Sequence, residues 1–296
     1  MSKTQLKGGR VALIDGDVLV YLAGFAAQKT IWTYSPTGEW FEGKTAANKW
    51  WAEQSPDPFD KEEWKSEVVP EPWNNCQFIV DGKIGECKHM TKSDEAIVFL
   101  TPSRTFRHEL AFTRGYKANR KGMPKPVYYE RIKAYLEDEY GAIYGKNMEA
   151  DDLMGMAQTK NSVICSNDKD MLQIAGRHYN FTLPKETAFT MVPPQDADLW
   201  FFTQLLSGDT TDNIPGIPGI GKAKARKMVD DYWDDPKELV RAIREQYVHS
   251  YGAAGLDIME EQAALVWILR SGETPDNAGW RELLGVKHEE SKRVSA

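Results

Sequence analysis

Short runs of apolar residues alternate along the chain with longer stretches in which apolar positions recur at helical spacing. The runs at residues 11–14, 96–100 and 162–165 have the length and apolar character of buried strands. Further short strands are expected between residues 177 and 191. Strands that alternate with helices predict an α/β fold with a mainly parallel central sheet flanked by helices. The stretches predicted to be helical are residues 18–27, with Asp17 as the N-cap, and residues 127–140, 150–159 and 196–206.

Residues 30–92 interrupt this alternation. Residues 31–34 and 39–41 flank the turn sequence Ser35-Pro-Thr-Gly38, which predicts a β-hairpin. The run at residues 77–80, followed by Asp81-Gly82, predicts a second hairpin. We expect the tryptophans of this segment to bury area in a small subdomain, and stacking on bases is the alternative. These tryptophans are Trp32, Trp40, Trp50, Trp51, Trp64 and Trp73.

The same pattern predicts two domains. Residues 1–195 form the α/β domain, which contains the tryptophan-rich insertion at 30–92 and a segment rich in Lys and Arg at 104–133. Residues 196–296 form a helical C-terminal module.

Charge is distributed unevenly along the chain. The formal net charge of −7 argues weakly against a nucleic-acid partner. Residues 104–133 reverse this balance, since they hold nine Lys or Arg residues and only two acidic ones, Glu109 and Glu130. A basic segment on an acidic chain predicts that a polyanion binds at one place. The alternative is a solvated helical face.

Several protein classes are disfavoured. The three cysteines form no C-x-x-C pair and the five histidines show no zinc spacing, so reduced, structural cysteines are expected. No apolar run approaches the roughly 20 residues that cross a bilayer. Residues 1–10 lack the apolar core of a signal peptide. We therefore expect a cytosolic protein that does not contact membranes.

Acidic residues gather where predicted strands end or predicted helices begin. Capping of helices is one explanation for each group. Together on one sheet edge, however, such carboxylates would repel one another unless cations neutralised them, and oxygen ligands without Cys or His favour Mg²⁺ or Mn²⁺ over Zn²⁺. Two such ions about 3.5–4 Å apart suit phosphodiester hydrolysis. The groups are Asp15, Glu149-Ala-Asp151-Asp152, Asp168-Lys-Asp170 and Asp209-Thr-Thr-Asp212.

A glycine-rich loop precedes a basic helix start. Gly216, Gly219 and Gly221 let the backbone turn tightly and approach a ligand closely. Lys222 and Lys224 follow in the first turns of the next helix, where they oppose the helix dipole. Contact with a phosphate at this helix N-terminus would explain them. The alternative is a plain connection between two helices.

These motifs together resemble the flap-endonuclease-like 5′ nucleases, which include phage 5′–3′ exonucleases and the 5′-nuclease domain of bacterial DNA polymerase I. Residues 207–221 are similar to that family's helix-3-turn-helix, which we place at 207–230. The likeness spans residues 10–29 and 95–230, and leaves 30–92 and the tail from about 231 unexplained. The other matching motifs are Asp15 after the first strand, E-A-D-D at 149–152, S/T-x-D-x-D at 166–170 and Y-K-x-N-R at 116–120.

The resemblance implies roles for individual residues. Asp15, Glu149 and Asp151 would hold the catalytic metal, directly or through water. Lys117 and Arg120 would reach the scissile phosphate. The second metal site would use Asp152, Asp168, Asp170, Asp209 and Asp212. DNA would be contacted by Arg104, Arg107, Tyr116, Gly216, Gly219, Gly221, Lys222 and Lys224.

The chain departs from the family at one position. The family has an aspartate after its second conserved strand, and counting back from Tyr116 places Ser103 there. A hydroxyl is a weaker cation ligand than a carboxylate and brings no charge. We expect an acid such as Asp81 or Asp94 to compensate.

The resemblance implies a PIN-like fold and a two-Mg²⁺ mechanism, with Mn²⁺ as a substitute and K⁺ at the helix-3-turn-helix. The expected reaction is hydrolysis of DNA at 5′ ends or flaps, with RNA in hybrid duplexes as a further substrate, by a monomer in phage-type replication or recombination. The alternatives are a catalytically weakened protein that binds branched DNA, and a PIN-type ribonuclease.

Overall fold

The first apolar run forms the central part of a six-stranded sheet. This computed structural model describes residues 9–59, 61–232 and 234–286. β1 (Val11–Asp15) is buried along its whole length and lies between two parallel neighbours, β5 (Glu95–Leu100) and β7 (Ser162–Cys165). β6 (Ile143–Tyr144) and β8 (Gly176–Tyr179) extend the parallel sheet, and β9 (Phe189–Val192) closes one edge antiparallel to β8. The prediction of a mainly parallel sheet is confirmed.

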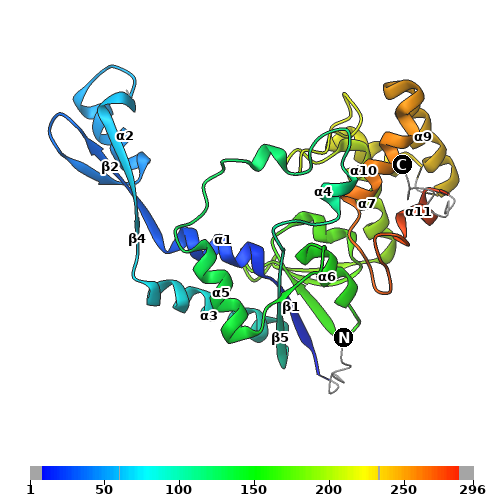
Figure 1. Ribbon diagram of the computed structural model, residues 1–296, viewed down its shortest axis with the longest axis horizontal. Helices are drawn as coiled ribbons and strands as arrows, with labels where there is room; N and C mark the ends of the chain where they lie inside the picture. The colour runs from blue at the N-terminus through cyan, green and yellow to red at the C-terminus, as the bar shows by residue number, and fades with distance from the viewer. Residues whose placement is uncertain (1–8, 60, 233, 287–296) are drawn as a thin grey trace, which may run out of the picture.

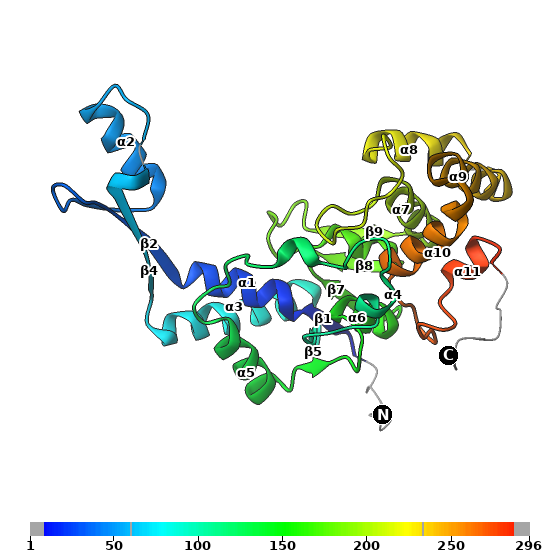
Figure 2. The ribbon, with the colours of Figure 1, turned by 45° about the horizontal axis from the view of Figure 1, so that its top comes forward.

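Helices cover both faces of this sheet (Figures 1 and 2). On one face, α1 (Gly16–Ala26), α3 (Trp73–Thr91) and α5 (Tyr129–Tyr140) bury apolar side chains against the strands. On the other face, α6 (Ala150–Ala157) and the 3₁₀ helix η3 (Lys169–Gln173) do the same. The predicted helices at 18–27, 127–140 and 150–159 are therefore confirmed, with boundaries shifted by a few residues.

Two local predictions were wrong. The N-cap of α1 is Asp15, whose carboxylate accepts a hydrogen bond from the amide of Val18, so Asp17 lies inside the helix. The second predicted hairpin is instead part of α3. Its buried side chains recur at helical spacing and pack on the sheet, and this packing outweighs the turn preference of Asp81-Gly82. Those buried residues are Cys76, Val80, Ile84, Cys87 and Thr91.

The first hairpin of the insertion is confirmed and belongs to a lobe that projects from the sheet domain (Figure 1). The lobe contains a three-stranded antiparallel sheet with the strand order β3 (Trp40–Glu42), β2 (Gln28–Tyr34), β4 (Trp64–Pro70). It also contains α2 (Lys44–Gln54) and the short 3₁₀ helix η1 (Lys61–Glu63).

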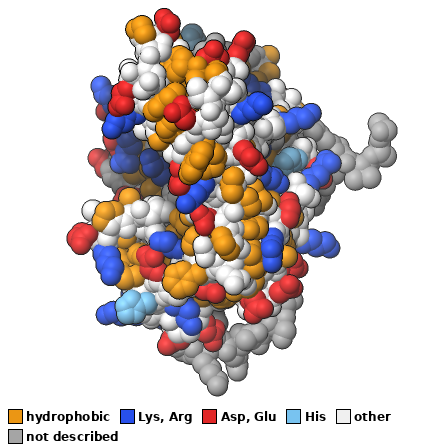
Figure 3. Space-filling model, turned by 90° about the vertical axis from the view of Figure 1, so that its left-hand side faces the viewer, with side chains coloured by type: hydrophobic (Ala, Val, Ile, Leu, Met, Phe, Trp, Pro, Cys, Tyr) orange, Lys and Arg blue, Asp and Glu red, His pale blue; other side chains and the backbone are white. Residues whose placement is uncertain are grey.

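Aromatic side chains form the interior of this lobe. The Tyr34 ring lies 5.2–5.5 Å from the rings of Trp50, Trp51 and Trp64. These tryptophans therefore bury area against one another, as expected, whereas Trp40 is 65% exposed. Residues 28–70 hold eight acidic and five basic residues, and the face at this end of the molecule mixes both charges with apolar side chains (Figure 3). The lobe thus carries more acidic than basic residues, which disfavours a polyanion as its partner.

The C-terminal helices gather around a hydrophobic cluster of their own. They are α7 (Pro194–Ser207), α8 (Lys222–Asp231), α9 (Pro236–Tyr251), α10 (Gly255–Val266) and α11 (Trp280–Leu283), with the single turn η4 (Gly252–Ala254). Phe106 and Tyr116 from the basic segment also enter this cluster. The boundary at residue 195 stays a prediction. Within the described ranges, no helix is both long enough and apolar enough to cross a membrane.

The basic segment is mostly loop. It begins with α4 (Arg107–Leu110), passes through the single turn η2 (Ala118–Arg120), and then runs alongside α1 to reach α5 (Figures 1 and 2). At its far end the amide of Val127 donates to Gln28 at the base of the lobe.

Two glycines bring α7 and the glycine-rich loop into backbone contact. Gly208 and Gly216 have φ of 68° and 63°, and a Cβ built on Gly216 would lie 2.2 Å from the amide nitrogen of Gly208. The amide of Ile217 also donates to the carbonyl of Leu206. No side chain fits between these two backbone segments, so both positions require glycine.

We expect Gly216→Ala to lower the free energy of unfolding by about 2–5 kcal/mol, because left-handed strain and overpacking add. Thermal unfolding measures this. Gly221→Ala is the control, since its φ is −81° and no atom lies within 4 Å of an added Cβ. Equal stability of the two variants would contradict the packing argument.

Candidate active site

The carboxyl ends of β1, β5 and β7 open into a cleft of about 680 Å³. Eight acidic and four basic residues line it, so the predicted acidic groups converge at one edge of the parallel sheet. The acidic residues are Asp15, Asp17, Glu149, Asp151, Asp168, Asp170, Asp209 and Asp212, and the basic ones are Lys117, Arg120, Lys169 and Lys222.

Ser166 joins the ends of β1 and β7. Its hydroxyl donates to Asp15 Oδ2 at 2.7 Å and accepts from the amide of Asp168 at 3.0 Å. Asp168 Oδ1 in turn accepts from the amide of Asp170. Ser166, the serine of the S-x-D-x-D motif, therefore holds the turn at Asp168 against Asp15. The sequence analysis did not predict this role.

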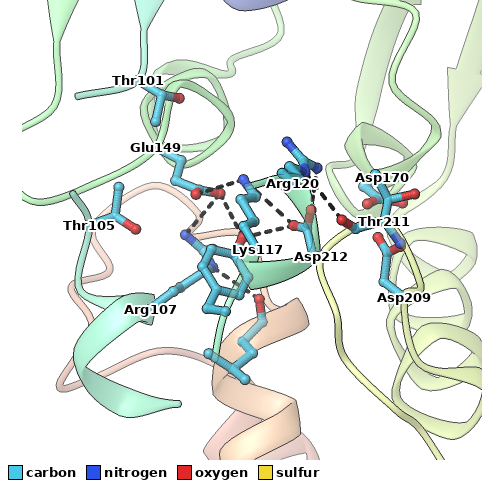
Figure 4. Close-up of polar contacts among 12 residues, drawn as sticks. Thr101, Thr105, Arg107, Lys117, Arg120, Glu149, Asp170, Asp209, Thr211 and Asp212 are labelled. Carbon is cyan, nitrogen blue, oxygen red and sulfur yellow. Dashed lines mark hydrogen bonds and ion pairs between the residues drawn. The ribbon is translucent and has the colours of Figure 1, made fainter. Parts of the chain in front are cut away.

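The base of the basic segment is joined to the loop before the glycines (Figure 4). Lys117 Nζ lies 2.8 Å from Glu149 Oε1 and 3.6 Å from Asp212 Oδ2, while Arg120 pairs with Asp212 Oδ1. The hydroxyl of Tyr116 donates to Glu149 and Asp212. Hydrogen bonds and ion pairs thus join the Y-K-x-N-R motif at 116–120 to Asp212, more than ninety residues away.

Burial and crowding perturb the acids on the sheet side. Burial, followed by repulsion from Asp17, raises the pKa of Asp15 to about 7. Burial and the neighbouring Asp168 and Asp209 raise the pKa of Asp170 to about 8. Burial also raises the pKa of Asp151 well above its ordinary value, with Asp15 adding to the effect. A cation bound beside these carboxylates would stabilise their charged forms.

On the opposite wall, cations dominate. Burial alone would raise the pKa of Glu149, but Arg107 and Lys117 outweigh it and lower that pKa. Burial alone would lower the pKa of Lys117, but Glu149 and Asp212 outweigh it and raise that pKa. Glu149 and Lys117 therefore both stay charged at neutral pH.

Asp17 is a site residue that the sequence analysis missed. Its Oδ2 accepts from the amide of Thr101, the first residue after β5, at 3.1 Å. Burial raises the pKa of Asp17 despite this hydrogen bond. A carboxylate thus stands at the carboxyl end of β5, although it comes from α1.

Apolar side chains on α1 complete the cleft. Val18, Tyr21, Leu22 and Phe25 recur at helical spacing and line it. Tyr21 and Phe25 are 39% and 45% exposed, with ring centroids 6.0 Å apart. Exposed aromatic rings are suited to stacking on a planar ligand such as a nucleobase.

Comparison with known proteins agrees with this geometry. Residues 80–196 match the family of the 5′–3′ exonuclease N-terminal resolvase-like domain. The exodeoxyribonuclease of Enterobacteria phage T3 is 33% identical over 202 residues, 60% of this chain and 62% of the relative. The exonuclease of Escherichia phage T7 is 30% identical over 195 residues, 60% of this chain and 63% of the relative. The chain thus spans less than two thirds of the length of these curated relatives.

The chain is therefore similar to phage exonucleases over 60% of its length. Its fold is also that of the D15 protein of phage T5, solved in co-crystals with metal ions. The TM-score is 0.53 with 15% identity, over 86% of this chain and 88% of that one.

Four predicted roles do not fit where the structure places the residues. Arg107 is 2% exposed and forms a two-pronged ion pair with Asp152, which is itself fully buried and outside the cleft lining. Arg107 therefore presents no donor to DNA, and Asp152 acts in structure rather than at the second metal. Tyr116 is 5% exposed, and Gly216 packs on Gly208, so neither reaches a DNA surface.

The two acids that we expected to compensate for Ser103 lie away from the cleft. Ser103 is exposed and does not line the cleft. Asp94 accepts from the amide of Arg10 at the opposite end of the sheet, and Asp81 accepts from the hydroxyls of Tyr135 and Tyr140. Neither of these two acids lines the cleft, whereas Asp17 does.

The remaining DNA-contact predictions stay predictions. Arg104, Gly219, Gly221, Lys222 and Lys224 are exposed, as a contact with DNA requires.

The raised pKa values predict a pH dependence of stability. Unfolded aspartates ionise near pH 3.8, whereas Asp15 and Asp170 ionise near 7 and 8 in the fold. The folded chain then binds more protons between these values, so the free energy of unfolding falls as pH rises through this window. We expect EDTA-treated protein to lose stability from about pH 4 to about pH 8, and Asp15→Asn to lose less. Chemical denaturation at several pH values measures this, and an equal pH slope in both proteins would contradict it.

Proposed function

We propose that this chain is a divalent-metal-dependent 5′–3′ exonuclease or flap endonuclease acting on DNA. The observation that carries the proposal is the pairing of one acidic wall and one basic wall around a single cleft at the sheet edge. The phage relatives are named as exonucleases, and the T5 protein has also been solved as a flap endonuclease with DNA and metal ions.

The donor set fits hard cations. The acidic groups at the cleft offer carboxylate oxygens, and none of the described residues that line it is His or Cys, which suits Mg²⁺ or Mn²⁺. In the described ranges, no three His, Cys, Asp or Glu side chains are grouped tightly enough to enclose an ion as they stand. Asp15, Glu149 and Asp151 would hold one ion, with water completing its shell, and Asp168, Asp170, Asp209 and Asp212 the other. Bound there, the ions would activate water and stabilise the leaving oxygen.

The chain's own cations would hold the substrate. Lys117 pairs with Glu149, and Arg120 pairs with Asp212. The oxygens of a phosphate in the cleft would replace these two carboxylates as partners of Lys117 and Arg120. Tyr21 and Phe25 would stack on the base next to that phosphate. Lys222 and Lys224, at the start of α8, would contact the backbone further along the duplex.

Further parts of the proposal are taken from the resemblance to the flap-endonuclease-like 5′ nucleases. They are a K⁺ ion at the turn of residues 216–221, RNA in hybrid duplexes as a further substrate, and action as a cytosolic monomer in phage-type replication or recombination.

The first test is cleavage of 5′-labelled and 3′-labelled flap and blunt duplex DNA, with Mg²⁺ and with EDTA. We expect metal-dependent products counted from the 5′ end, whose lengths distinguish exonucleolytic from endonucleolytic cutting. Asp168→Ala should slow cleavage roughly a hundredfold or more, because a charge-stabilising group is lost. Tight binding of branched DNA without cutting in Mg²⁺ or Mn²⁺ would establish the weakened binder instead. Cutting of single-stranded RNA without a need for a 5′ end would establish the ribonuclease.

Asp17 supplies the negative charge that the position after β5 lacks. Asp17→Asn keeps an acceptor for the amide of Thr101 but removes the charge. We expect about tenfold weaker Mn²⁺ binding, measured by calorimetry without DNA, because affinity at such sites follows the number of ligand charges. Asp81→Asn, outside the cleft, is the control. Unchanged Mn²⁺ affinity in Asp17→Asn would exclude this role.

A further inference from the structure

The new inference concerns residues 265–270, here called the strap. They are the last two residues of α10 and the four residues after it, which form neither helix nor strand. The strap lies close to α6, since a Cβ on Gly155 would meet the Leu269 carbonyl oxygen at 2.3 Å. This tail lies outside the motifs that resemble the 5′ nucleases.

The strap fixes the orientation of a fully buried amide, that of Gln173. The Gln173 Nε2 donates to the carbonyl of Val266 at 2.6 Å, and its Oε1 accepts from the amide of Ile268 at 3.4 Å. Backbone donors and acceptors cannot exchange roles, so the Gln173 amide has only one orientation that satisfies both. Arg270 adds a hydrogen bond to the backbone carbonyl of Gln173.

Gln173 in turn orients a second buried amide, that of Gln204 on α7. Gln173 Nε2 donates to Gln204 Oε1, which leaves Gln204 Nε2 to donate to Asp170 Oδ1 at 2.6 Å. Gln204 is only 6% exposed, so water is a poor substitute for either partner. A relay of two glutamines thus runs from the strap backbone to a carboxylate of the cleft.

The other end of the strap reaches the opposite acid. Arg107 donates to the carbonyls of Leu265 and Trp267 and pairs with Asp152. Asp152 accepts from the amide of Leu269 and from the amide of Glu149. The backbone of Glu149 is therefore positioned by the same six residues that position Asp170.

We propose that the strap sets the separation of Asp170 from Glu149 across the cleft, with Gln204 and Gln173 acting as positioning residues for Asp170. The proposal rests on the proposed function, because its meaning depends on ions held between these acids. It also joins the site to the C-terminal helices, since Glu261 of α10 accepts from the amides of Phe112 and Thr113 in the basic segment. A shift of α10 would then move the basic segment and the acids together.

The test compares three variants in the full chain. Gln204→Leu removes the donor to Asp170. Gln173→Met keeps the donor of Gln204 but removes the hydrogen bond that orients the Gln204 amide. Gln173 itself contacts no acid of the cleft, so any effect of this variant on Asp170 is transmitted through Gln204. Gln262→Leu is the matched control, because Gln262 is a fully buried glutamine of α10 that accepts from Tyr247 and has no link to the acids.

We expect Gln204→Leu to bind Mn²⁺ about tenfold more weakly by calorimetry without DNA, and Gln173→Met to show a smaller loss of the same kind. Single-turnover cleavage should slow at saturating DNA, with unchanged DNA affinity measured in EDTA. Gln262→Leu should lower the melting temperature but leave Mn²⁺ affinity unchanged. If Gln204→Leu fails to fold, Gln173→Met decides the question.

Equal Mn²⁺ affinity in Gln173→Met and Gln262→Leu would overturn the relay. Wild-type protein that binds Mn²⁺ but cuts no DNA would refute the proposed function instead, and the Mn²⁺ titrations would still decide the role of the strap. Absence of Mn²⁺ binding in the wild type would refute both.

Discussion

Burial of neighbouring carboxylates at one sheet edge, to which their mutual repulsion adds, is the constraint on which this site depends. The chain does not relieve it by moving the acids apart. It raises the pKa of Asp15 and Asp170 to about 7 and 8, and it sets Lys117 and Arg107 against Glu149 on the facing wall. Neutral donors such as Ser166 stabilise the remaining charge. The folded chain thus stores electrostatic strain that a cation would release.

The parallel sheet makes this gathering possible. β1 lies between β5 and β7, so three strands deliver their carboxyl ends to the same edge, at the point where the connections diverge to either side. The E-A-D-D residues at the start of α6 join them from the other face of the sheet. Backbone contact between Gly208 and Gly216 then holds the loop of Asp209 and Asp212 against the cleft. The acids thus come from β1, α1, α6, η3 and the loop before the glycines, and the proposed relay holds Asp170 from behind.

The tryptophan-rich insertion leaves this arrangement undisturbed. It leaves the sheet domain after α1 and returns at α3, two helices that pack on the same face. Its aromatic interior is its own, and none of its residues lines the cleft. It holds more acidic than basic residues, which disfavours a polyanion as its partner. Within the described part of the chain, the lobe stands apart from the cleft.

By itself, the sequence determined the central strands, most helices, the likeness to 5′ nucleases and most of the acids at the cleft, because strand runs, caps and acidic motifs are local patterns. Only the tertiary structure decided that Asp17 serves the end of β5, since its side chain turns toward Thr101, 84 residues away. It likewise paired Arg107 with Asp152 and converted an apparent hairpin into α3. The direction and burial of a side chain depend on neighbours brought together by packing, and no local pattern encodes them.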